Sequence, residues 1–200
     1  MTIALRLVWL KDLWIQKRLD DVVWMQFVPC DIDLFHVEFR AVFDYLAKII
    51  HIVSNLPRQV PSNFTILKEW VAKSDRNAKR LGDLAEVLLS CDWFDDLKEI
   101  RNSIIHKGWF TLAFLERSKI LFQVYGMKKE VLTSEIVFKD NVVDFELYAG
   151  LYIGYLIAYL EKVSEMIFKH QNLEKIDCNA KSYHQGLRVV RGWIERVLYQ

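Results

Sequence analysis

Arg101, Asn102 and His106 are the residues of this chain whose types and spacing best suit chemistry. Arginine carries a fixed positive charge on a forked donor, and histidine gains or loses a proton near neutral pH. The sequence contains no glycine-rich phosphate loop, no serine or cysteine in the setting of a catalytic triad, and no cluster with metal-ligand spacing. The other four histidines stand alone, and we expect structural roles for His36, His51, His170 and His184. In an ideal helix, Arg101 and His106 are about 7 Å apart along the axis and roughly 140° apart around it, so they meet only if Arg101 reaches round.

The stretch from Cys91 to Gly108 predicts the helix that positions these residues. Asp92 suits the capping position of the first turn, and Gly108 is a typical stop signal. One apolar stripe at helical spacing is formed by Trp93, Leu97, Ile100 and Ile104. A polar stripe roughly opposite is formed by Asp95, Glu99, Asn102 and His106. We therefore expect Leu97 to be buried and His106 to face outward, beside an apolar Ile105 that indicates contact with something other than water.

Arg101-Asn102, followed after three further residues by His106, resembles the motif of the HEPN superfamily (higher eukaryotes and prokaryotes nucleotide-binding). That family has an Arg, four to six residues and then a His, often with a polar residue straight after the Arg. The resemblance covers residues 31–170 as architecture, and only Arg101, Asn102 and His106 as chemistry. It implies a mainly α-helical fold, an antiparallel HEPN-like bundle, which in this chain would carry an inserted β-hairpin at about 119–143.

The resemblance also implies a reaction: metal-independent RNA cleavage without a cofactor, in which the ribose 2′-OH attacks the adjacent phosphate. In that scheme His106 moves a proton, Arg101 holds the phosphate and its developing charge, and Asn102 positions His106 or binds a phosphate oxygen. HEPN ribonucleases bring the motifs of two subunits together, so the implied partners are RNA, a second copy of the chain and an antitoxin or regulatory protein. Gly108 stands where a subgroup of toxin–antitoxin HEPN proteins has Tyr, so modification by a nucleotidyltransferase antitoxin is not expected.

Three functions stay open at this point. The first is a HEPN ribonuclease of toxin or defence type, and the second is a non-catalytic HEPN-like module that binds nucleotide, RNA or a partner protein. The third is an interaction bundle with no nucleic-acid role, in which His106 is simply a helix-ending histidine favoured by the helix dipole. An intact Arg101–His106 pair favours the first over the second. A basic patch from distant residues around His106 favours either over the third.

The composition predicts one well-cored domain over residues 1–200, because 52% of the 200 residues are hydrophobic and 14% are aromatic. The net charge of +1 gives no global attraction to nucleic acid, so an RNA site has to be a local patch. We expect Cys30, Cys91 and Cys178 to be reduced, buried thiols of a cytoplasmic protein. The N-terminus is a poor signal peptide, and the longest apolar run, 147–160, is shorter than the roughly 20 residues that span a bilayer. No membrane partner is expected.

The helices expected along the chain are inferred from the spacing of apolar residues and from helix-breaking residues. An N-terminal helix within 1–28 is expected to end at Pro29. From Asp31 or Asp33, spacing of three and four predicts a bundle helix whose stripe comprises Ile32, Phe35, Phe39, Val42, Leu46, Ile49 and Val53, widened by Phe43 and Ile50. Further helices are expected at 65–72, 75–90, 144–170 (central, because it is apolar nearly all round) and 181–199. The basic residues Arg76, Lys79 and Arg80 are interpreted as a solvated face rather than a phosphate site.

A change to period two predicts the β-hairpin. Residues 120–125 and 131–138 are rich in β-branched and aromatic side chains, and 126–130 would join them. A second turn at 139–141 would lead to a short third strand. Because so small a sheet is not stable by itself, it should lean on the helical bundle.

Overall fold

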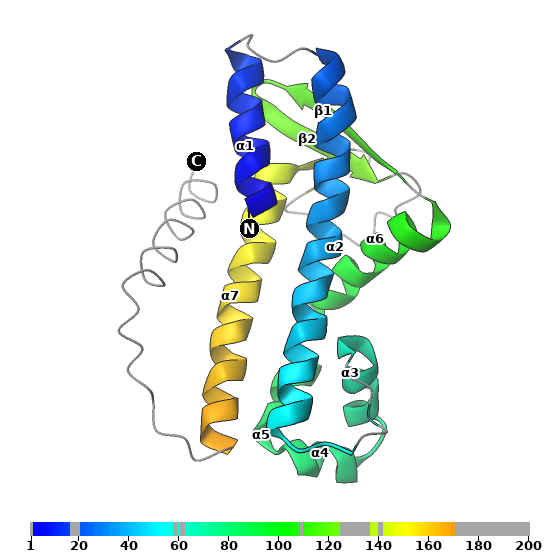
Figure 1. The fold of residues 1–200 in the computed structure, drawn as a ribbon, viewed down its shortest axis with the longest axis vertical. Coiled ribbons are helices and arrows are strands. Elements are labelled where there is room, and N and C mark those ends of the chain that lie inside the picture. Colours follow the sequence, from blue (N-terminus) through cyan, green and yellow to red (C-terminus); the bar gives the residue numbers. More distant parts are fainter. Residues whose placement is uncertain are drawn as a thin grey trace.

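The computed structural model describes residues 2–16, 21–57, 60, 63–108, 110–124, 137–139 and 142–170. In this part the chain is mainly helical with one small antiparallel sheet, as the sequence predicts (Figure 1). The features specific to a HEPN fold stay a prediction. The expected helix at 181–199 lies outside the described residues. None of the helices in these ranges is long and apolar enough to cross a membrane.

Helices α1 (Thr2–Ile15), α2 (Asp21–Val53) and α7 (Phe145–His170) form the long part of the molecule (Figure 1). The first two are antiparallel, since Arg6 pairs with Asp31 and the rings of Trp14 and Trp24 lie 6.0 Å apart. In contrast, α2 and α7 run side by side in the same direction (Figure 1). Ring contacts advance along both of these helices together, from Phe35–Tyr148 to Phe43–Tyr159. The expectation of an antiparallel bundle therefore holds for α1 and α2 but not for α2 and α7.

Pro29 lies inside α2 and does not end a helix, which corrects the predicted boundary between 1–28 and 31–170. Proline lacks an N–H and crowds the carbonyl four residues earlier, so its place here needs compensation. Trp24, Val28 and Ile32 continue the helical spacing across it, and all three side chains are buried in the core. Burial of this face on both sides of Pro29 favours one continuous helix. The first two helices are instead separated between Ile15 and Asp21.

The core face of α2 drifts around the helix, because 3.6 residues per turn do not match a strict seven-residue repeat. Ile32, Phe35, Phe39 and Leu46 of the predicted stripe are buried. Further along, Phe43 and Ile50 are fully buried, whereas Ile49 of the stripe is 49% exposed. Phe43 and Ile50, which are expected only to widen the stripe, thus form the main packing face of the second half of α2.

Three short helices connect α2 with the candidate site. The predicted helix at 65–72 is α3 (Phe64–Ala72), which begins where the Asn63 side chain accepts a hydrogen bond from the N–H of Ile66. The helix predicted at 75–90 is divided into α4 (Asp75–Leu81) and α5 (Asp83–Leu89) by Gly82, whose φ of +57° is unfavourable for other residues. Its apolar face is buried as predicted, through Leu81, Leu84 and Leu88.

The sheet differs from the predicted hairpin at 119–143. Its strands are β1 (Thr111–Glu116), β2 (Lys119–Val124), β3 (Val137–Lys139) and β4 (Val142–Asp144), in the order β1-β2-β4-β3. β2 pairs with β1 and β4, and β3 pairs with β4, so a hairpin of β2 with the 131–138 segment is wrong. The turn between β1 and β2 is Arg117-Ser118, both with positive φ, which glycine-based turn rules do not predict. The short strand expected after 139–141 is confirmed as β4.

The sheet leans on the helices, as its small size requires. The ring of Phe122 on β2 lies 6.0 Å from that of His36 on α2 and 5.2 Å from that of Tyr148 on α7. His36 donates or accepts through Nε2 at 2.9 Å from the Tyr148 hydroxyl, and its Nδ1 lies 2.8 Å from the Ile32 carbonyl oxygen. Burial lowers the pKa of His36 to about 4, so it is neutral at physiological pH. Its expected structural role is confirmed.

Helix α7 is central, as predicted. The carboxylate of Asp144 accepts a hydrogen bond from the N–H of Glu146 at 3.0 Å and so caps its first turn. Tyr148, Tyr152 and Tyr159 are buried against rings from α2 and from α6 (Trp93–Lys107). The cysteine prediction holds only in part: Cys91 is a buried free thiol, whereas Cys30 is free and exposed. Cys178 lies outside the described residues.

Candidate functional site

Helix α6 (Trp93–Lys107) carries the three residues singled out by the sequence. Gly108 ends it in the left-handed conformation with φ +66°, as predicted. Asp92 stands at the expected first position, but its side chain makes no capping bond, because its own backbone is already helical. Lys68 of α3 holds the start of α6 instead, by donating to the Cys91 carbonyl at 2.8 Å and to the Asp95 carboxylate at 3.0 Å.

The two faces of α6 are those that the sequence predicts. Leu97 and Ile100 are buried, and Trp93 and Ile104 pack partly buried against the core. The fully buried Phe94 is an addition that the predicted stripe did not include. Trp93 contacts Phe39 of α2 and Tyr152 of α7, with ring centroids 6.4 and 6.0 Å apart. On the other face His106 is exposed and Asn102 is half-buried.

Arg101, Asn102 and His106 come together in the structure. Nη1 of Arg101 lies 3.1 Å from Nε2 of His106 and donates to Oδ1 of Asn102 at 3.2 Å. The long arginine side chain therefore reaches round the helix and covers the 140° that separates the two positions. Because a guanidinium only donates, a hydrogen bond at this contact has Nε2 of His106 as its acceptor. An acceptor nitrogen beside a fixed cation is what a proton transfer at a phosphate requires.

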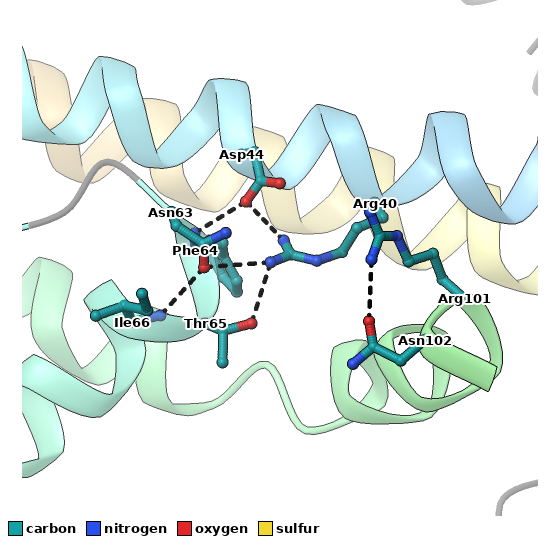
Figure 2. A network of polar contacts seen from close by, with 8 residues as sticks. All are labelled: Arg40, Asp44, Asn63, Phe64, Thr65, Ile66, Arg101 and Asn102. Carbon is teal, nitrogen blue, oxygen red and sulfur yellow. Dashed lines mark hydrogen bonds and ion pairs between the residues drawn. The ribbon is translucent and has the colours of Figure 1, made fainter. Parts of the chain in front are cut away.

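A fourth residue, Arg40 of α2, adjoins this group and was not predicted. Its side chain is only 9% exposed and runs from α2 to the start of α3 (Figure 2). It pairs with the Asp44 carboxylate at 2.8 Å, and donates to Asn63 Oδ1 at 3.3 Å and Thr65 Oγ1 at 3.1 Å. Its guanidinium carbon lies 4.8 Å from the ring centre of Phe94 on α6. Arg40 thus connects α2, α3 and α6 at one point.

The sequence does contain a signal for Arg40. It stands directly after Phe39 and three positions before Phe43, within the apolar face of the predicted bundle helix. A charged side chain in such a position has to be paired, because an isolated buried charge is very costly. That rule predicts a partner for Arg40, and one turn later Asp44 supplies it.

The charges at this site do not cancel among the described residues. Burial lowers the pKa of Arg40, the Asp44 carboxylate raises it, and the positive charge of Arg101 lowers it, so the two guanidinium groups are close enough to repel. Arg40 is paired with Asp44, whereas Arg101 makes no ion pair within the described ranges. Moreover, Nε of Arg101 is buried and has no hydrogen-bond partner there. The site therefore combines one excess positive charge with an unused buried donor.

The remaining basic residues named from the sequence lie away from this site. Arg76, Lys79 and Arg80 on α4 are exposed, in keeping with a solvated face. Arg80 donates to the Asn55 carbonyl at 3.3 Å, and Arg76 and Arg80 line a cleft of about 400 Å³ beside Trp70. In the described part of the chain, no group of three or more His, Cys, Asp or Glu residues is placed to hold a metal ion.

Comparison of the chain with protein-family models, with curated proteins and with solved structures gives no match. The site is distinguished by the contact between Arg101 and His106 and by the uncompensated positive charge beside them.

Proposed function

We propose that the protein is a HEPN-type, metal-independent endoribonuclease of toxin or defence type, acting in the cytoplasm. The single observation that carries this proposal is the 3.1 Å contact between Arg101 Nη1 and His106 Nε2. It puts a fixed cation and an imidazole nitrogen at one point on an outward helix face. Cleavage of RNA through its own 2′-OH needs those two groups: a base for the hydroxyl proton and a cation for the phosphate.

The reaction begins when a phosphodiester enters the site. Arg101 exchanges its bonds with Asn102 and His106 for bonds with the non-bridging phosphate oxygens, which frees Nε2 of His106. Nε2 accepts the 2′-OH proton while O2′ forms its bond to phosphorus. The bond from phosphorus to the 5′ oxygen breaks, and that oxygen takes a proton from water, to which His106 returns the proton that it accepted. The products are a 2′,3′-cyclic phosphate and a free 5′-OH. Asn102 orients His106 or binds a phosphate oxygen.

Two proton transfers in one turnover favour a site shared between two copies of the chain. Ile105, next to His106, is 48% exposed, and Phe110 just beyond the end of α6 is 52% exposed. Exposed apolar side chains of this size beside a polar site suit a self-complementary interface. In this proposal Ile105, Asn102 and His106 lie near a two-fold axis, and an antitoxin or regulatory protein controls the assembly.

A second function is supported by the excess positive charge. Arg101, with Arg40 behind it, would hold a phosphate group whether or not His106 takes a proton. A non-catalytic module that binds nucleotide, RNA or a phosphorylated partner is therefore the alternative. The two functions differ in the fate of the RNA, which is cut in the first and only bound in the second.

The test is cleavage of a varied set of RNAs by the purified chain. His106→Ala and Arg101→Ala should each abolish most cleavage, whereas His51→Ala, which removes a histidine at the end of α2, should leave it unchanged. DNA of the same sequence should resist cleavage, and one 2′-deoxynucleotide should protect its own site alone. A chelator should not inhibit. Undiminished cleavage by His106→Ala would end the assignment, and binding of RNA without cleavage would favour the second function.

A further inference from the structure

We infer that the partly buried Arg40–Asp44 pair sets the charge of an oxyanion site at Arg101, with Arg40 as a positioning residue for the bound phosphate group. The inference rests on the proposed function only in taking that phosphate to be an RNA phosphodiester. Neither Arg40 nor Asp44 belongs to the Arg101, Asn102, His106 motif, and both lie on a different helix.

The charged groups around Arg101 carry a net positive charge. Arg40 contributes one positive charge, Asp44 one negative charge and Arg101 one positive charge, which leaves one positive charge in excess. The other hydrogen-bond partners of these arginines among the described residues bring no carboxylate: Asn63 and Thr65 for Arg40, and Asn102 and His106 for Arg101. Asp44 is accordingly the one carboxylate found in contact with this group within the described residues. An anion is the species that balances such a site.

Arg101 also has an N–H donor that makes no hydrogen bond among the described residues. Nε of Arg101 is buried and has no partner in the described residues, although a buried N–H that makes no hydrogen bond is costly. Figure 2 shows Arg101 extending from α6 toward α2, beside the start of the Arg40 side chain, and not toward Asp44. Once Arg101 leaves its bonds to Asn102 and His106 and turns toward solvent, a phosphate oxygen at Nε would satisfy the donor and the charge together.

Arg40 acts on the phosphate site without touching the phosphate. It is held in place from three elements, by Asp44, by the start of α3 and by the Phe94 ring. Its charge neutralises Asp44, which would otherwise oppose an anion at Arg101. Without Arg40, the carboxylate would cancel the charge of Arg101 and leave no net attraction. Arg40 thus keeps Arg101 available to an anion.

The experiment measures the dissociation constant of inorganic phosphate at low ionic strength, by calorimetry on the full chain. Arg40→Met removes one positive charge and should weaken phosphate binding about three- to tenfold, the effect of one partly screened unit charge a few ångströms away. Arg40→Met/Asp44→Asn restores the excess charge and should bind nearly as well as the wild type. Asp44→Asn alone raises the excess charge and should bind more tightly than the wild type. Arg40→Lys, which retains the charge, is the matched control, and Arg101→Met should bind least.

The order of phosphate affinities among these variants distinguishes an effect of charge from an effect on the fold. Asn at position 44 still offers an oxygen to the Phe64 N–H, which Asp44 accepts at 3.1 Å. If Arg40 merely holds α2 to α3, the double variant should bind as weakly as Arg40→Met, and Asp44→Asn should not bind more tightly than the wild type. Either of these results would overturn the inference. If Arg40→Met fails to fold, the phosphate affinities of Asp44→Asn and Arg40→Lys still distinguish the charge effect from the structural effect.

Failure of the proposed function gives a different pattern. If the predicted order of phosphate affinities holds but no RNA is cut, the ribonuclease assignment fails and the oxyanion site remains. If RNA is cut and the cleavage depends on His106, but the phosphate affinities of the variants do not follow the charge count, the inference about Arg40 and Asp44 fails. The ribonuclease assignment then remains.

Discussion

Leu97→Ala tests the face assignment of α6 on which the whole site depends. Leu97 is fully buried between Phe94 and Ile100 on the core side of the helix. The change removes three carbons, each worth about 0.8 kcal/mol of burial. The cavity left behind adds to this, so the total loss in the free energy of unfolding should be about 2–5 kcal/mol. Urea unfolding followed by circular dichroism measures it.

Ile105→Ala is the matched control, since it removes a similar amount of apolar side chain from a solvent-exposed position between the two faces of the same helix. Ile105 is 48% exposed, so its loss should cost under about 1 kcal/mol when measured at protein concentrations that keep the chain monomeric. A loss below about 0.5 kcal/mol at Leu97, with a large loss on substitution of Asn102 on the polar stripe, would mean that the faces are reversed. In that case His106 would point into the core and the proposed chemistry would be impossible.

Three further predictions concern catalysis, assembly and pH. His106→Ala and Arg101→Ala should each lower RNA cleavage by roughly 10²–10⁴-fold in single-turnover assays, with the unfolding midpoint nearly unchanged because neither side chain supports the core; loss of cleavage together with loss of folding would leave the roles unproved. Ultracentrifugation should show a homodimer that Ile105→Asp dissociates with loss of cleavage, and an active monomer would exclude a shared site. Burial, and secondarily the charge of Asp95, raises the pKa of Asp96 to about 6, so the folded state loses stability as pH rises from about 4 to about 6. Asp96→Asn should remove this slope from urea midpoints measured across that range, and an unchanged slope would contradict the assignment.

The elements that the sequence predicts well are those with strong local signals. The stop at Gly108, the burial of Leu97 and the central place of α7 follow from helical spacing and capping chemistry. The local rule that proline ends a helix fails at Pro29, because the buried side chains of Trp24 and Ile32 continue the packed face on either side. Tertiary packing overrides that local preference.

The sheet shows a second limit of reasoning from sequence. Strand β1 follows the candidate helix closely, and its partner β2 is only two residues further on. The turn between them uses Arg117 and Ser118 at positive φ, a conformation for which glycine and asparagine are the usual signals. Pairing of β2 with β4 is set by the packing of Phe122 on His36 and Tyr148, which no local pattern contains.

The site itself shows how a motif on one helix becomes a site between two. With five positions from Arg101 to His106, the ideal helix places them on different sides, so only a long, flexible side chain can join them. When Arg101 reaches His106 through Nη1, its Nε lies in a buried position near α2. Its electrostatic surroundings are then determined by Arg40 and Asp44, which the spacing of the motif does not specify. A sequence can therefore contain the motif and still differ in anion affinity, because the residues that set the charge belong to the helix that α6 packs against.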